Sequence, residues 1–139
     1  MKSFKIGDCE FDLIPIIKGL VSEKDKVIQA LDSKTYDATA VALGAEDITA
    51  ISKRDEIEGE FESSDLDTVY SGLLTQFGNI DMPDPAFTTL IDICKDRDIP
   101  VIPLDMTDDE YTQLYCETVS TAEFLREKRL IKKALKNKF

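Results

Sequence analysis

The sequence contains no histidine. Imidazole activates serine and cysteine nucleophiles near neutral pH and is a frequent zinc ligand. The absence of histidine therefore excludes Ser-His-Asp and Cys-His catalysis and histidine-based metal sites. We expect a protein that performs none of these reactions. We favour a protein that is not an enzyme, and an enzyme that uses other residues is the alternative.

Cysteines and long apolar runs are scarce as well. The three cysteines, Cys9, Cys94 and Cys116, are odd in number and form no CxxC pair, so no disulfide framework is expected. Cys94 and Cys116 lie within helical apolar patterns, and we predict buried structural thiols at both. The amino-terminal residues lack the apolar core of a signal peptide, and no apolar run is long enough to span a bilayer. These features predict a cytoplasmic protein without a membrane span.

Glycine-rich phosphate loops are missing too. Neither GxGxxG nor GxxxxGKS/T occurs in the sequence. Nucleotide binding therefore has no support from motifs, and we expect no cofactor.

The charges that are present are unevenly distributed along the 139 residues. The formal net charge is -11, yet residues 124–139 hold seven Lys or Arg and a single acid. Residues 1–123 therefore carry -17. A negative field of this kind repels nucleic acid and anionic lipid, so we do not expect a nucleic-acid partner.

The hydrophobic pattern predicts alternating strands and helices. Two strands at 3–6 and 9–17 flank a Gly7-Asp8 turn, and apolar strands are expected at 36–43 and 99–104. Helical spacing predicts helices at 23–33, 45–52, 65–77, 85–97, 108–118 and 121–137. The charged stretch 53–64 is expected to be an exposed loop or a short edge strand. The fold class is therefore α/β, with a small, mostly parallel sheet flanked by helices on both faces in a single domain, 1–139.

Helix starts are signalled by capping residues. Ser22 and Ser64 are predicted N-caps, and Asp84 is an N-cap followed by proline. Thr107 and Ser120 each begin an S/T-x-x-E capping box.

Residues at the carboxyl ends of the predicted strands form a candidate ligand site, because ligands of open parallel sheets bind there. The candidate ligand-binding residues are Lys18, Gly19, Gly44, Glu46, Asp47, Asp105 and Asp108. Asp105, Asp108 and Asp109 are candidate ligands for Mg²⁺ or Mn²⁺, which prefer oxygen. The alternative is that these acids only complement the positive ends of the helices that follow them.

The basic carboxyl-terminal helix, 124–139, is the candidate partner-contact segment. Its candidate contact residues are Phe124, Arg126, Lys128, Arg129, Lys132 and Lys133. We favour docking on the acidic body of the same chain or of a sister subunit, and a homo-oligomer or a protein partner follows from this. Contact with nucleic acid or membrane, and plain complementarity to the helix dipole, are the alternatives.

Three segments carry a family likeness. VSEKDKV at 21–27, DATAVAL at 37–43 and IPVIPLD at 99–105 resemble the helix start, the strand and the "GIPVxLID" segment of the TraB/PrgY-like family. The resemblance covers about residues 14–105 and implies an α/β fold. The family's GxxH histidine falls on Leu20, and its strand glutamate falls on Ala42. The metal-dependent hydrolysis that the resemblance implies for better-known relatives therefore has no matching residues here.

We therefore predict a non-catalytic TraB-like domain that acts by protein association or self-association. The alternative is an enzyme, or a binder of a small ligand or divalent metal, that uses the carboxylates at the strand ends.

Overall fold

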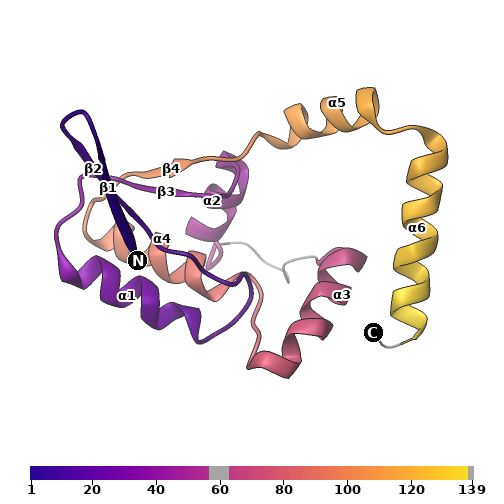
Figure 1. Cartoon of the computed structure of the whole chain (residues 1–139), viewed down its shortest axis with the longest axis horizontal. Coiled ribbons are helices and arrows are strands. Elements are labelled where there is room, and N and C mark those ends of the chain that lie inside the picture. Colours follow the sequence, from indigo (N-terminus) through magenta and orange to yellow (C-terminus); the bar gives the residue numbers. More distant parts are fainter. Residues whose placement is uncertain (57–62, 138–139) are drawn as a thin grey trace.

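The computed structural model describes residues 1–56 and 63–137 as a mixture of helices and short strands (Figure 1). The strands are β1 (Lys2–Ile6), β2 (Cys9–Leu13), β3 (Thr39–Val41) and β4 (Val101–Pro103). The helices are α1 (Glu23–Ser33), α2 (Ala45–Ser52), α3 (Asp65–Leu74), α4 (Pro85–Asp96), α5 (Asp108–Thr118) and α6 (Thr121–Lys136), with a 3₁₀ turn η1 (Thr75–Phe77) after α3. Residues 57–62 of the loop or edge strand predicted at 53–64 lie outside the described residues. Residues 138–139 of the predicted basic segment lie outside them as well.

Helix starts follow the predicted caps, with one exception. The side chains of Ser64, Thr107 and Ser120 each accept a hydrogen bond from the third helical residue and complete a capping box. Asp84 caps α4 through the backbone N–H groups of its first turn. The prediction for Ser22 is wrong, because Ser22 already has helical backbone angles and its side chain makes no capping bond. An N-cap needs an extended backbone to aim its oxygen at the helix end.

The strands form two separate pairs and not one sheet. β1 and β2 are an antiparallel hairpin, whereas β3 and β4 are parallel. The prediction of a small, mostly parallel sheet therefore holds only for β3 and β4. The strand predicted at 9–17 ends at Leu13, two residues before Pro15, which has no N–H to donate to a ladder.

Helices cover one face of the β3–β4 pair. The core is built from Val27 and Leu31 of α1 with Ala86 and Cys94 of α4, and Val101 packs against it. On the opposite face, Ala40 and Ile102 are exposed. The prediction of helices on both faces is therefore wrong, because the side chains that alternate to the second face of these short strands have no layer to pack on.

The last two helices form an arm that leaves this core (Figure 1). After β4 the chain runs outward into α5, which contains no buried residue, and α6 turns back beside α3. Ile131 is the buried residue of α6. None of the described helices is both long enough and apolar enough to cross a membrane.

Candidate association surfaces

The candidate residues that follow β3 and β4 meet, whereas Lys18 and Gly19 do not directly follow a strand. A Cβ placed on Gly44 would lie 2.9 Å from the carbonyl oxygen of Met106, so the chain leaving β4 passes directly over the start of α2. Lys18 follows β2, which belongs to the separate hairpin, by five residues. Lys18 and Asp47 nevertheless line one small cavity of about 160 Å³. The structure thus brings part of the predicted ligand set together.

The acidic residues of this set lie at helix starts. Glu46 and Asp47 are in the first turn of α2, and a carboxylate oxygen of each lies within 4 Å of the position of a Cβ on Gly44. Asp105 accepts a hydrogen bond from the N–H of Met106 at 2.8 Å. Among residues 1–56 and 63–137, no three acidic or thiol side chains are grouped closely enough to hold a metal ion.

Asp108 and Asp109 occupy the first turn of α5 and are exposed. Glu110, the next residue, closes the capping box with Thr107, and these hydrogen bonds lower the pKa of the Glu110 carboxyl. The amino end of α5 is thus already capped from within the helix.

Gly19 is held by a buried carboxylate. The Gly19 N–H donates to Asp84 Oδ2 at 2.8 Å, while Oδ1 of the same side chain accepts from Ala86 N at 2.9 Å. Asp84 is 4% exposed, so these bonds satisfy a carboxylate that water does not reach. Gly19 has a φ of 97°, a conformation that favours glycine. Both residues therefore have a structural role here.

The two positions at which the TraB/PrgY-like resemblance would place polar residues lie in different environments. Leu20 is buried and pairs with Ile80 through an isolated backbone bridge. Ala42 is exposed just after β3. Each carries an aliphatic side chain and offers no ligand atom.

The predicted contact residues of α6 are exposed. Phe124 is 40% exposed, and the ammonium of Lys128 lies 5.5 Å from the centre of its ring. Arg126, Arg129, Lys132 and Lys133 are also on the surface. No cation of α6 forms an ion pair with any described carboxylate. The own-chain contact with α3 therefore does not use the charge of this helix.

Apolar side chains of the arm are exposed beside these cations. We define the arm surface as Tyr111, Leu114, Leu125 and Leu130 together with the α6 cations. Its four apolar members are between 47% and 59% exposed. Tyr115 donates a hydrogen bond to Glu127 at 3.0 Å and so ties α5 to α6. The prediction of a buried thiol at Cys116 is wrong, since α5 has no buried residue and Cys116 is exposed, whereas Cys94 is buried as predicted.

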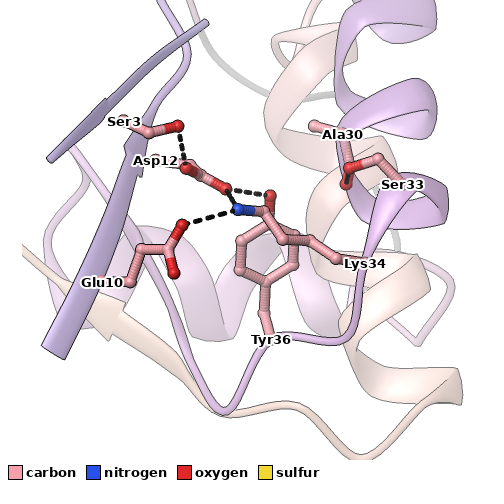
Figure 2. Close-up of polar contacts among 7 residues, drawn as sticks. All are labelled: Ser3, Glu10, Asp12, Ala30, Ser33, Lys34 and Tyr36. Carbon is pink, nitrogen blue, oxygen red and sulfur yellow. Dashed lines mark hydrogen bonds and ion pairs between the residues drawn. The ribbon is translucent and has the colours of Figure 1, made fainter. Parts of the chain in front are cut away.

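A polar cluster that the sequence did not reveal fastens the hairpin to the body (Figure 2). Asp12 Oδ2 is 2.6 Å from Lys34 Nζ and accepts from the Tyr36 hydroxyl at 2.7 Å, while Oδ1 accepts from Ser3 at 2.5 Å. Glu10 lies 3.3 Å from the same ammonium. The hydrogen bonds from Lys34, Ser3 and Tyr36 lower the pKa of the Asp12 carboxyl to about 2.

The orientation of the hairpin follows from this cluster. Side chains alternate along a strand, so Ser3, Lys5, Glu10 and Asp12 share one face, which we call the inner face. The other face, which we call the outer face, consists of Lys2, Phe4, Ile6, Cys9, Phe11 and Leu13. Phe4 and Phe11 stack at 5.3 Å, yet all six outer-face residues are exposed. The alternation and the Gly7-Asp8 turn were visible in the sequence, but nothing local indicated that the polar face would face the body.

No protein-family model, no curated protein and no solved structure matches this chain.

Proposed function

We propose that this chain acts by self-association, without catalysis, and that the arm surface docks on a second copy. The observation that supports the proposal is the large solvent-accessible surface area of the chain. Its solvent-accessible surface is 10374 Å², whereas a compact monomer of 15.6 kDa would expose roughly 7,200 Å². The surplus, roughly 3,200 Å² on this scaling, exceeds the area that one partner loses even in a large homodimer, roughly 1,000–2,500 Å².

The arm explains much of this surplus. An isolated helix exposes most of its surface, and α5 buries none of its residues against the rest of the chain. Exposed apolar side chains on such a helix would stabilise the protein only if a partner buried them. Arms of this kind stabilise dimers when two copies exchange them reciprocally.

Charge favours a second copy as the partner. The arm ends in the basic segment 124–139, and the remaining residues of each chain carry -17. The α6 cations have no ion-pair partner among the described residues of their own chain. Each copy thus offers the opposite charge to the arm of the other, a complementarity that screening by salt weakens.

Charge reversal on α6 tests the proposal. In sedimentation velocity at low salt, Arg129→Glu/Lys133→Glu should raise the dissociation constant of the arm contact about tenfold or more. The matched control is Lys24→Glu/Lys53→Glu, which changes the charge equally at exposed positions outside the arm. Equal effects of the two variants, or none, would contradict docking through the arm.

A second candidate function is supported by the cavity that Lys18 and Asp47 line. Its volume of about 160 Å³ suits an ion or a very small ligand. Binding of Mg²⁺ or Mn²⁺ at this site would raise the melting temperature, and the Asp47→Asn variant would lose the shift. The TraB/PrgY-like resemblance stays a prediction under both functions.

A further inference from the structure

The hairpin is oriented opposite to an ordinary amphipathic ribbon. A sheet with one apolar face normally packs that face on the core and turns its polar face to water. Here the stacked Phe4 and Phe11 are on the outer face, while Asp12 of the inner face is 2% exposed at its side chain. Phe4 and Phe11 remain 36% and 43% exposed, and this remaining apolar surface can be buried only against a partner.

The inner face fixes this orientation. Turning the ribbon over would separate Asp12 from Lys34 and Tyr36 (Figure 2) and leave a carboxylate and an ammonium without partners. Such a loss is costly for the Asp12 carboxylate, whose side chain is 2% exposed in the docked hairpin. The polar cluster therefore holds the outer face in the position of a docking surface.

We propose that the outer face is a twofold interface with the outer face of a second copy, a contact that rests on the proposed self-association but is separate from the arm. Phe4, Phe11 and their outer-face neighbours would form a layer between two ribbons, as in the packing of two sheets. In Figure 1 the hairpin and α6 lie at opposite ends of the long axis, so both contacts can form at once.

Charge selects a second copy and sets its direction. The hairpin carries the positive Lys2 at its base, on the outer face, and the negative Asp8 at its tip. Packed tip on tip, two ribbons would place like charges together. Packed antiparallel about a twofold axis, each Lys2 lies near Asp8 of the other copy, which is an attractive pairing.

The area is consistent with two contacts. The outer face alone offers an apolar patch of a few hundred Å² per copy, which is less than a stable interface of about 800 Å² per partner needs. The arm therefore carries most of the association, and the hairpin adds a smaller, apolar contact. Two separate twofold contacts join chains beyond a dimer, into a closed tetramer or an open series.

Sedimentation equilibrium of the full chain and its variants tests the two contacts separately. We expect species larger than a dimer for the natural sequence at low salt. The arm variant Arg129→Glu/Lys133→Glu should leave a dimer, held by the hairpin, that persists at about 0.5 M salt because apolar burial is not screened. Adding Phe4→Ser/Phe11→Ser to it should weaken that dimer about a hundredfold.

Two further variants distinguish loss of the interface from unfolding of the hairpin. Ile6→Lys leaves the Phe4–Phe11 stack in place but puts a charge into the interface, and it should weaken the same dimer about tenfold or more. Lys5→Gln on the inner face is the matched control and should leave the dimer unchanged. A monomeric arm variant would overturn the hairpin interface and leave the arm proposal standing. If the natural sequence forms only a dimer, held by the arm alone, the hairpin interface is likewise overturned and the arm proposal stands.

Zero-length cross-linking between carboxyl and amino groups checks the antiparallel direction. Lys2 and Asp8 of one chain lie at opposite ends of the ribbon, roughly 15–20 Å apart at the rise of a strand. In a mixture of ¹⁵N-labelled and unlabelled chains, we expect Lys2–Asp8 links that join one labelled and one unlabelled peptide. Their absence from a mixture that still forms the hairpin dimer would overturn the proposed arrangement.

Discussion

Lys34 Nζ lies 2.6 Å from Oδ2 of Asp12, and this ion pair joins the amino-terminal hairpin to the end of α1. Tyr36 donates to the same oxygen from the segment that leads into β3. Desolvation and the hydrogen bond to Asp12 raise the pKa of the Tyr36 hydroxyl, and the bond to Asp12 raises that of the Lys34 ammonium. A carboxylate with three donors thus fixes which face of the hairpin meets the body.

Removing either member of this pair should loosen the hairpin. In Asp12→Asn or Lys34→Met we expect amide protons of β1 and β2 to exchange about tenfold faster, because the remaining charged or polar partner loses its bonds. Protons of α1 and α4 should keep their exchange rates. Unchanged exchange in the hairpin would show that other contacts hold it.

The Asp12 carboxyl should also give the stability a specific pH dependence. Its pKa is lowered from 3.8 to about 2 in the folded chain. The unfolded chain therefore binds more protons between these values, and the stabilising contribution is complete above pH 3.8, then lost as the pH falls through about 2. The difference in unfolding free energy between the natural chain and Asp12→Asn should shrink across this window. A difference that stays constant down to pH 2 would contradict the assignment.

Asp98 is a position where glycine should stabilise the fold. Its φ of 56° lies in the left-handed region, directly after α4, where the N–H of Ile99 donates to Cys94 O at 2.8 Å. Asp98→Gly should raise the unfolding free energy by about 0.5–1 kcal/mol, since glycine adopts this conformation without strain. The matched control, Asp96→Gly within the helix, should lower it by about 0.5–1 kcal/mol. Chemical denaturation of both variants measures the contrast.

Asp84 should be among the least replaceable polar residues. Asp84→Ala removes the cap of α4 and leaves the buried N–H of Gly19 unpaired, so we expect a loss of about 2–4 kcal/mol in unfolding free energy. Asp81→Ala, at a nearby exposed position, should cost less than about 0.5 kcal/mol. Similar losses in the two variants would count against the structural role of Asp84.

Local signals predicted the helices well because caps act over a few residues. The capping boxes at Thr107 and Ser120 and the Asp84-Pro85 start of α4 all lie where the sequence places them. Ser22 failed because its backbone is already helical, which the sequence does not encode locally. The apolar spacing of α5 did not predict burial, because the described part of the chain leaves every residue of that helix at least partly exposed.

Contacts between segments far apart in the sequence were harder to predict than the helices. A mostly parallel sheet was expected, but the sequence did not give its strand order. The separation of the hairpin from β3 and β4 depends on how Lys34 and Tyr36 engage Asp12 more than twenty positions away. The alternation of side chains along a strand defines two faces, but it does not determine which of them packs against the rest of the chain. The candidate strand-end residues could be predicted from their residue types and their positions after predicted strands. The exposed outer face of the hairpin could not, because it depends on which face packs against the rest of the chain.

Sedimentation equilibrium of the unmodified chain at low salt tests the central claim most directly. Self-association predicts a molar mass at least twice the 15.6 kDa of one chain, falling as salt weakens the arm contact. A mass of one chain at every concentration up to about 100 μM, with no dependence on salt, would contradict it.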